Sequence, residues 1–563
     1  MRRPPTACRV AIRFWPAGQA CAWLLWPAWR WKKLLKSMSA RIALMASSAL
    51  KKMALWSSVR QPAKRSALSL AMIVRVCGRL RLRSALLSSY SASVIMRWRM
   101  ELLCPQPPDT SGCSLLEAFL IMSLNTQKSK ELFERSRGLM IEGGSSSSRG
   151  PVNYGAYPLF MQRGQGSRIY DVDGNSYIDW LMSYGALPLG HAHPRVVEAL
   201  CQAAASGSHF ATATDIEIEV AEMIQRIVPS AERVRFANTG TEATMAAVRL
   251  ARGYTGKPKF IKFEGHYHGW YDDYLVSSNP QPLTTLGHRN DPIKIPDSSG
   301  LNRHALDDTI VVPWNDLGAL ERAIDTYRGQ IAAILSEGIM ANMGIIPPAE
   351  GYLQGLQELA RKHNILFILD ETVTGFRIAA GGCQQYYQLQ PDITTFGKAL
   401  GAGLPVAGIV GRAEVMEALS WGGVLHYGTQ NASRIGLHAA RASLQVLTED
   451  DGAAFHQIWR IADLLCNGLR ELFKELGVAA IVQNVGPMLQ ILFTERPAIS
   501  DYREYCQYVD RPRYQRFIWE LFKHGVYTTP SATLHSIVSL AHSEQDVEIT
   551  LAAARKVLAH GTN

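Results

Sequence analysis

Asn364-Ile365-Leu366-Phe367-Ile368-Leu369-Asp370-Glu371 is an apolar run that ends in two carboxylates. A short run without alternation is typical of a strand that is buried on both faces, as in a parallel sheet covered by helices. Asp370 is then expected at the carboxyl edge of the sheet, where ligands bind in such folds. Because a buried acid needs a cationic partner, Asp370 is a candidate for holding a positively charged group of a ligand. In isolation, the residue is equally compatible with a helix N-cap.

Short apolar stretches and amphipathic helices alternate on both sides of this run. Buried strands separated by helices indicate an α/β fold with a mostly parallel sheet covered on both faces. After about residue 450 the pattern changes to long helices with short strands between them, which predicts a second, smaller α+β domain. A hairpin around Asp173-Gly174-Asn175 precedes the alternating region. The expected strands are 167–171, 176–181, 233–237, 260–263, 331–336, 364–369, 489–493 and 537–540, and the expected helices are 125–141, 241–252, 353–361, 454–476 and 513–523.

The first 121 residues differ in composition from the rest of the chain. They hold 20 Lys and Arg against 3 Asp and Glu, whereas the remaining residues hold 39 against 45. The segment lacks sustained helical or strand periodicity, and its apolar stretches are too short to span a bilayer. We therefore expect residues 1–121 to be a basic extension that is non-native or disordered, with a targeting or membrane-surface arm as the alternative. Because the positive charge is confined to this extension, it does not indicate nucleic-acid binding by the folded part.

Four cysteines follow the basic extension, namely Cys201, Cys383, Cys466 and Cys506. They are isolated, with neither the CxxC pairs nor the Cys/His spacing that is typical of a metal site, so no metal is expected. Scattered single thiols are typical of a reducing compartment, and the cytoplasm is therefore the expected localisation.

A lysine lies among small and apolar residues in Phe396-Gly397-Lys398-Ala399-Leu400-Gly401. In such a setting its amine can stay partly neutral and form a Schiff base with an aldehyde. The alternative is a surface lysine in a glycine-rich loop. A protonated pyridine nitrogen is a suitable cationic partner for Asp370, and an aspartate at that position keeps the ring an electron sink.

Two further stretches could bind the rest of such a ligand. Asn238-Thr239-Gly240-Thr241-Glu242-Ala243 lies between an expected strand and an expected helix, where N–H groups at a helix N-terminus can approach a phosphate. Phe263-Glu264-Gly265-His266-Tyr267-His268-Gly269 offers rings that can stack on a flat heterocycle, although His268 is equally compatible with a structural role. Each stretch alone is common. Together, the four occur in the order phosphate cup, stacking ring, carboxylate and lysine, with Asp370 28 residues before Lys398.

This order of motifs resembles the class III aminotransferases of the fold-type I pyridoxal 5'-phosphate (PLP) family. Within that family the chain is most similar to the glutamate-1-semialdehyde 2,1-aminomutase-like group, over roughly residues 125–560. The resemblance implies a large PLP-binding domain over residues 191–430. The small domain would combine an N-terminal segment, 122–190, with a C-terminal segment, 431–563. Further matching motifs are YDVDGN at 170–175, LGHAHP at 189–194, DETVTGFR at 370–377 and GKALGAGLP at 397–405.

The resemblance also implies roles for individual residues. Lys398 would form the Schiff base with PLP and later move protons, and Asp370 would hold the pyridine nitrogen. The chain would form a homodimer with shared active sites, because Thr429 matches a threonine that reaches the phosphate of the neighbouring subunit. The other implied cofactor-binding residues are Gly240 and Thr241 at the phosphate, Tyr267 stacked on the ring, and Asn342 near the phenolic oxygen.

The substrate-binding positions are the ones that depart from this group. Arg149 matches the arginine that holds the substrate carboxylate, a task that suits a bidentate guanidinium, although a solvated arginine in a Ser/Gly loop is the alternative. Tyr184, implied as a substrate-binding residue, stands where the mutases often have tryptophan. Leu534 stands where they tend to have glutamate.

The cofactor motifs are thus intact while the pocket has changed. We therefore expect a transaminase that moves an amino group between a carboxylate-bearing amino donor and a keto or aldehyde acceptor. The first alternative is a glutamate-1-semialdehyde 2,1-aminomutase, an isomerase that forms 5-aminolevulinate. The second is a non-catalytic, PLP-free relative that acts as a binding protein.

Overall fold

The computed structural model describes residues 124–154 and 156–559, without the side chains of residues 152 and 154. The expected basic extension, residues 1–121, lies outside the described residues, so its interpretation stays a prediction. None of the helices in the described part is long and apolar enough to cross a membrane.

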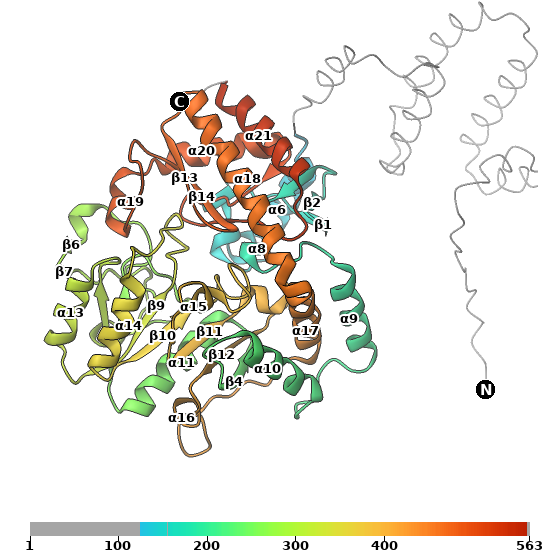
Figure 1. The fold of residues 1–563 in the computed structure, drawn as a ribbon. Helices are drawn as coiled ribbons and strands as arrows, with labels where there is room; N and C mark the ends of the chain where they lie inside the picture. The colour runs from blue at the N-terminus through green and yellow to red at the C-terminus, as the bar shows by residue number, and fades with distance from the viewer. Residues whose placement is uncertain (1–123, 155, 560–563) are drawn as a thin grey trace, which may run out of the picture. The chain divides into compact units, whose positions relative to one another are not determined.

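The largest sheet has seven strands in the order β4-β12-β11-β10-β9-β5-β8 (Figure 1). Only β12 runs antiparallel to its neighbours β4 and β11, so the sheet is mostly parallel, as the sequence predicts. Every residue of β9 and β10 is buried, which explains why these strands appear in the sequence as unbroken apolar runs. The strands are β4 (Arg233–Ala237), β5 (Lys259–Phe263), β8 (Thr309–Val312), β9 (Ile331–Glu337), β10 (Leu366–Asp370), β11 (Ile393–Phe396) and β12 (Ala407–Gly411).

Helices pack against this sheet through small and apolar side chains. Helix α11 (Gly240–Thr255) contacts the strands β4, β9, β10, β11 and β12, and its buried face includes Ala243, Ala247 and Ala251. Small side chains on this face let the helix backbone lie close to the strands. Helix α14 (Tyr352–Lys362) packs on β10. Both helices confirm the sequence-based expectation.

Segments from the two ends of the described chain share a four-stranded sheet. Strands β1 (Met161–Gln165), β2 (Arg168–Asp171) and β3 (Ser176–Asp179) are extended by β15 (Val526–Tyr527), which pairs in parallel with β3. The expected hairpin around Asp173-Gly174 is the β2–β3 pair. A separate sheet joins β13 (Ala480–Val485), β14 (Met488–Phe493) and β16 (Ser536–Ile537). The expected domain boundaries, 190/191 and 430/431, stay a prediction.

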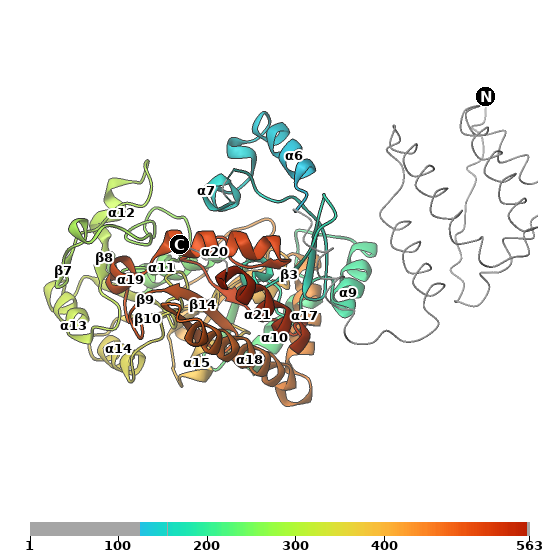
Figure 2. The ribbon, with the colours of Figure 1, turned by 90° about the horizontal axis from the view of Figure 1, so that it is seen from above.

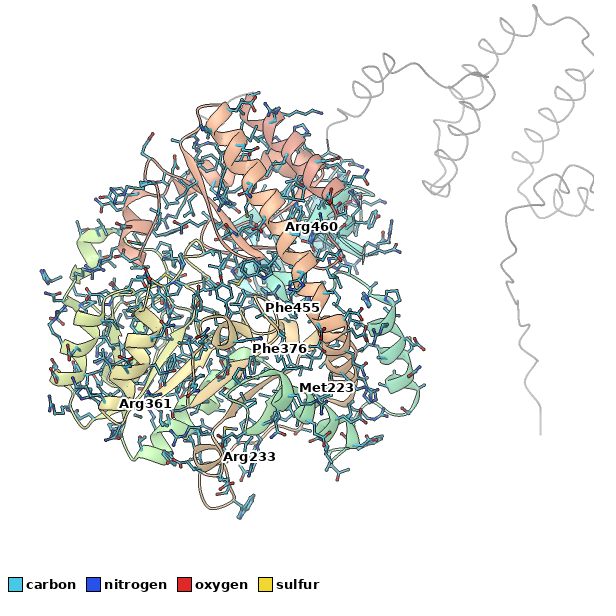
Figure 3. All side chains as sticks on the ribbon, viewed as in Figure 1. Met223, Arg233, Arg361, Phe376, Phe455 and Arg460 are labelled. Carbon is cyan, nitrogen blue, oxygen red and sulfur yellow. The ribbon has the colours of Figure 1, made fainter. Side chains whose placement is uncertain are left out.

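Three long helices cover the C-terminal region. They are α18 (Ala453–Glu475), α20 (Arg511–Lys523) and α21 (Glu544–Ala559), and α21 packs beside both of the others (Figures 1 and 2). Their buried faces join the same apolar core as the segment after β10. Phe376 and Phe455, which Figure 3 labels, both belong to this core. The core therefore connects the C-terminal helices to the segment that follows Asp370.

Some expected elements are shorter in the structure than in the sequence-based prediction. Helix α6 (Gln127–Arg137) ends at Gly138, and residues 141–143 form a separate 3-10 turn. The strand expected over 176–181 ends at Asp179, because the carboxylate of Asp179 accepts two following N–H groups and turns the chain. The strand expected over 537–540 includes only Ile537, because a hydrogen bond between Ser539 and His542 bends the chain there. Turn-forming hydrogen bonds of polar side chains thus override strand propensity at both places.

Candidate functional site

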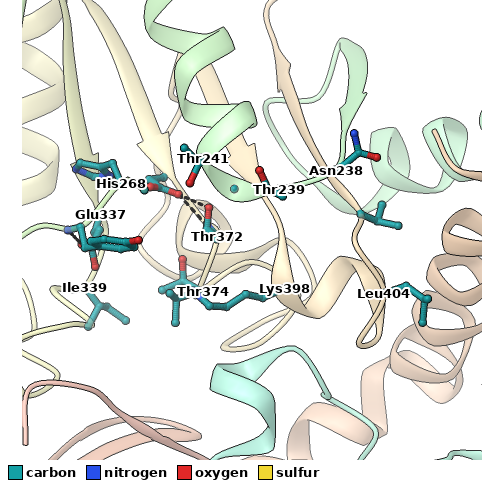
Figure 4. Close-up of a pocket in the computed structure, with 16 residues that line it drawn as sticks. Asn238, Thr239, Thr241, His268, Glu337, Ile339, Thr372, Thr374, Lys398 and Leu404 are labelled. Atoms are coloured by element: carbon teal, nitrogen blue, oxygen red, sulfur yellow. Dashed lines mark hydrogen bonds and ion pairs between the residues drawn. The ribbon is translucent and has the colours of Figure 1, made fainter. Parts of the chain in front are cut away.

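A cavity of about 220 Å³ lies where β9 and β10 end and α11 begins (Figure 4). This is the carboxyl edge of the parallel strands, the usual ligand edge of such sheets. Five of the predicted cofactor residues line it, namely Gly240, Thr241, Tyr267, Asp370 and Lys398. The structure therefore brings together residues that are up to 158 positions apart in the sequence.

Asp370 is held as an ionised acceptor. Its Oδ1 accepts hydrogen bonds from the backbone N–H of Thr372 at 3.0 Å, the hydroxyl of Thr372 at 2.6 Å and the hydroxyl of Thr395 at 2.8 Å. Nδ1 of His268 donates to Oδ2 at 2.7 Å. Burial by itself raises the pKa of Asp370, but the bond and charge of His268 and the threonine hydroxyls lower it below the ordinary value. No helix begins at Asp370, so the alternative of a helix N-cap is wrong.

Lys398 begins the short 3-10 helix η7 (Lys398–Gly401) in a left-handed conformation, with φ at 41°. Its side chain lines the cavity and is only partly exposed, so the alternative of a surface lysine is wrong. Burial lowers the pKa of Lys398 to about 8, against the opposing effect of Asp370 and Glu337. A minor but appreciable fraction of the amine is therefore neutral near physiological pH, far more than for an ordinary lysine, as a nucleophile or base requires.

The first turn of α11 forms a cradle suited to an anion. Thr239 is the N-cap, and the carboxylate of Glu242 accepts the N–H groups of Asn238 and Thr239, so this acid is occupied with the backbone. The N–H groups of the first turn point out of the helix, and the helix dipole favours negative charge there. A side chain at Gly240 would place its Cβ 2.8 Å from Thr372, so the cradle needs glycine at this position. The geometry fits a phosphate.

Tyr267 presents a partly exposed ring to the cavity, and its backbone is anchored by Glu337. Oε1 of Glu337 accepts the N–H of Tyr267 at 2.8 Å, and Oε2 accepts the N–H of Ala341 at 2.8 Å. Burial raises the pKa of Glu337 to about 8, against the effect of these two N–H groups. The backbone N–H of Glu337 in turn donates to Nδ1 of His266 at 3.1 Å. Glu337 thus ties the stacking ring to the loop that leads to Asn342.

The cavity therefore provides an anion cradle, an exposed aromatic ring, an ionised carboxylate and a lysine of low pKa. Gly240 and Thr241 would hold the phosphate of PLP, Tyr267 would face its ring, and Asp370 would meet the ring nitrogen. These residues fit the cofactor. No group of three or more His, Cys, Asp or Glu residues that could hold a metal occurs in the part of the chain that the structure describes.

The structure does not place four other predicted residues on this cavity. Arg149, in the 3-10 helix η5 (Ser147–Arg149), and Thr429 are exposed. Asn342 follows the anchored Ala341 and is partly exposed, and Tyr184 is half-buried in α8 (Met182–Gly185). Their roles stay predictions.

The sequence-based reasoning missed the groups that hold Asp370 and Tyr267. The sequence presents His268 as a stacking ring or as a hydrogen-bonded structural histidine, and only the structure identifies its partner as Asp370. Thr395 lies opposite Asp370 in the parallel register of β10 and β11. The register of two strands cannot be read from either strand alone. Glu337 ends a buried strand just as Asp370 does, and that pattern could have identified it.

Comparisons with known proteins identify the family of the chain. The family model of the class III aminotransferases matches residues 150–558. Glutamate-1-semialdehyde 2,1-aminomutase 2 of Brevibacillus brevis is 40% identical over 436 residues, which cover 77% of this chain and 99% of that protein.

Solved structures of transaminases and aminomutases resemble the described fold. An omega-transaminase from Sphaerobacter thermophilus has a TM-score of 0.71 and 34% identity, covering 77% of this chain and 98% of that one. A glutamate-1-semialdehyde aminomutase variant from Pseudomonas aeruginosa was solved in complex with pyridoxamine phosphate (PMP). It has a TM-score of 0.67 and 25% identity, and the match covers 77% of this chain and 94% of that one. The expected fold type and cofactor are thereby confirmed, and the binding-protein alternative is not retained. The chain belongs to the class III aminotransferases and is a PLP-dependent enzyme of fold type I.

Proposed function

We propose that the protein is a transaminase that moves an amino group between a carboxylate-bearing amino donor and a carbonyl acceptor. The observation that carries this proposal is the acid-free segment 530–536, Pro-Ser-Ala-Thr-Leu-His-Ser. It lies against the loop after Glu337, because the N–H of Gly344 donates to the carbonyl of Thr533 at 3.2 Å. Leu534 is half-buried in this segment. An apolar side chain there gives no counter-charge to a second ammonium group, whose burial without a partner is costly.

The lack of a counter-charge matters because the two reactions differ in what they must retain. A mutase returns an amino group to the same carbon skeleton, so it must hold a diamine between its two half-reactions. A transaminase releases one product before it binds the next substrate, and this gives ping-pong kinetics. If the pocket binds the diamine only weakly, the diamine leaves, and the enzyme behaves as a transaminase.

The residues of the cavity perform defined tasks in this reaction. When bound, PLP supplies an electron sink for the negative charge that develops at the amino-bearing carbon. Nζ of Lys398, with a pKa of about 8, takes the proton from that carbon and returns it at the acceptor carbon. Asp370 stays ionised, and its charge stabilises the positive ring nitrogen. The N-terminus of α11 binds the phosphate, and Tyr267 orients the ring.

The second candidate is a glutamate-1-semialdehyde 2,1-aminomutase. It is favoured by the 40% identity to the Brevibacillus brevis enzyme over nearly the whole of that protein. Both candidates use Lys398 and Asp370 in the same way. They differ only in whether a second substrate is needed.

The test supplies glutamate-1-semialdehyde alone and measures 5-aminolevulinate. In a second arm, the enzyme receives a panel of amino acids and then a keto acid, and the cofactor absorbance follows each half-reaction. The proposal predicts slow or no isomerisation and a full cycle of both half-reactions with at least one donor and acceptor. Efficient isomerisation without a second substrate would overturn it in favour of the mutase. Lys398→Ala serves as the blank for both arms.

We also propose a homodimer with shared active sites in the cytoplasm. Trp421, Leu425 and Tyr427 are exposed apolar side chains in the same segment as the exposed Thr429. A partner subunit that covers them would bring Thr429 to a neighbouring cavity. The four cysteines of the described residues are free thiols, which supports a reducing compartment. Sedimentation should give about twice the chain mass of 62.3 kDa.

A further inference from the structure

The carboxylate of Asp370 is held unequally at its two oxygens. Among the residues that the structure describes, Oδ1 accepts three hydrogen bonds, two from Thr372 at 3.0 and 2.6 Å and one from the hydroxyl of Thr395 at 2.8 Å. Oδ2 accepts one, from Nδ1 of His268 at 2.7 Å. A carboxylate offers about four acceptor positions in all, so Oδ1 is saturated. Oδ2 is therefore the oxygen with room for a further donor from the cavity.

The donors to Oδ1 come from two different places in the fold. Thr372 follows Asp370 by two residues and lines the cavity (Figure 4), so its two bonds form a local turn after β10. Thr395 belongs to β11 and lies opposite Asp370 in the parallel pairing of the two strands. A local turn moves together with the chain that it closes, whereas a donor on the neighbouring strand does not. Thr395 thus holds Oδ1 from outside the local turn.

The fold keeps Thr395 rigidly in place. Its carbonyl accepts the N–H of Glu371 at 2.9 Å, and on its other side it pairs with Ile409 of β12. The residue is fully buried and is not among those that line the cavity. A buried hydroxyl needs a hydrogen-bond partner, and that of Thr395 donates to Asp370. A role of Thr395 in the reaction must therefore be exerted through Asp370.

The hydroxyl of Thr395 has two opposing effects on Asp370. Burial raises the pKa of Asp370, whereas the bonds from His268, Thr372 and Thr395 lower it, and a less basic carboxylate attracts a proton on the ring nitrogen less strongly. The same bond fixes the direction of Oδ2, which strengthens that attraction. The second effect should be the larger, because a hydrogen bond weakens steeply when its angle is lost. Without Thr395, His268 and Thr372 still keep the acid ionised.

We propose that Thr395 is a positioning residue, which holds Oδ1 of Asp370 so that Oδ2 faces the ring nitrogen of bound PLP. The role goes beyond the choice between transaminase and mutase, because both reactions use Asp370 in the same way. A charge that is oriented before the reaction needs no reorganisation during it, and such preorganisation is a large part of electrostatic catalysis. Thr395 therefore contributes to the rate without touching the substrate.

The test compares the wild-type holoenzyme with Thr395→Val and Thr395→Ser, and Thr394→Val is the matched control. Thr394 precedes Thr395 in β11 and is equally buried, but its hydroxyl contacts Ser230 and Gln384, neither of which lines the cavity. Valine keeps the shape of threonine without the hydroxyl, and serine keeps the hydroxyl. The set therefore separates the loss of the hydrogen bond to Asp370 from a general loss of packing in the strand.

The first readout is the protonation of the cofactor in the absence of substrate. The nitrogen-15 chemical shift of PLP labelled at its ring nitrogen is followed against pH in each holoenzyme. Thr395→Val is expected to lower the midpoint for loss of the ring proton by about one pH unit, because a hydrogen bond to a charged group is worth at least about tenfold in an equilibrium. Thr395→Ser and Thr394→Val should keep the wild-type midpoint, although both valine variants should lower the thermal midpoint.

The second readout is the single-turnover half-reaction with a competent amino donor. Thr395→Val should lower the maximal rate on the order of tenfold and leave the half-saturating donor concentration nearly unchanged, because only the chemical step depends on the ring nitrogen. If Thr395→Val does not fold, Thr395→Ala gives the same comparison, since the smaller side chain also lacks the hydroxyl.

Three outcomes would overturn the inference. An unchanged ring midpoint in Thr395→Val would make the hydroxyl merely structural. A raised midpoint would mean that Thr395 only weakens the charge of Asp370. An equal fall in Thr394→Val, or no recovery in Thr395→Ser, would attribute the effect to strand packing. If the wild type transfers no amino group and forms no 5-aminolevulinate, the proposed function fails, whereas the substrate-free titration still decides the role of Thr395.

Discussion

Replacing Asp370 by asparagine removes one negative charge from the cavity while keeping its hydrogen bonds. The amide oxygen can take the place of Oδ1 and accept from Thr372 and Thr395. The amide NH₂ group would then face His268, which can accept through Nδ1 in its other neutral tautomer. We therefore expect Asp370→Asn to fold and to bind PLP.

The size of the effect follows from the lost charge pair. Two unit charges about 4 Å apart interact by about 4 kcal/mol at an effective dielectric constant of about 20. Because each 1.36 kcal/mol of barrier changes a rate by about tenfold, the loss corresponds to about a thousandfold in kcat. The loss falls on the chemical step, because the ring nitrogen is no longer kept protonated.

The assay is the half-reaction with a competent amino donor, together with the thermal midpoint of each variant. Glu371→Gln is the matched control, because Glu371 is the adjacent buried acid and does not itself line the cavity. Its carboxylate accepts hydrogen bonds from the Thr374 hydroxyl and from the backbone N–H groups of Cys383 and Gln384. It should lower the thermal midpoint and leave kcat nearly unchanged. Near-normal turnover of Asp370→Asn, or an equal loss of turnover in Glu371→Gln, would refute the assignment of Asp370.

Three other predictions concern the lysine, acid stability and the N-terminal extension. Lys398→Ala should lose the visible absorption band of the bound cofactor. In the wild type, the rate of cofactor incorporation should rise with pH through about 8 rather than above 10, because the neutral amine is the form that reacts. Burial lowers the pKa of His535 to about 3 and that of His542 to about 4, so below pH 6.5 the unfolded chain binds protons that the folded chain does not. The free energy of unfolding should therefore fall between pH 6.5 and 4, and equal urea midpoints at pH 7 and pH 5 would contradict this. A chain that begins at Met122 should keep the folding, PLP content and activity of the full chain, and an insoluble or inactive truncation would show that the extension contributes to the fold.

The sequence by itself determined the strands, the helices and the order of the cofactor motifs. The apolar run before Asp370 predicts β10, and the turn Asp173-Gly174 predicts the β2–β3 hairpin, because both depend on neighbouring residues and on local backbone preferences. The lysine in a glycine-rich loop and the small residues before α11 are local in the same sense. Their order along the chain was sufficient to indicate a PLP site.

Only the tertiary structure decided which side chains support that site. His268 reaches Asp370 across 102 positions. Thr395 meets Asp370 because β11 lies beside β10 in one particular register. Strand order, register and the packing of distant loops arise from burying many apolar side chains at once, and no local stretch of sequence encodes them. For this reason the sequence indicates the cofactor, whereas the packed structure indicates how Asp370 is kept charged.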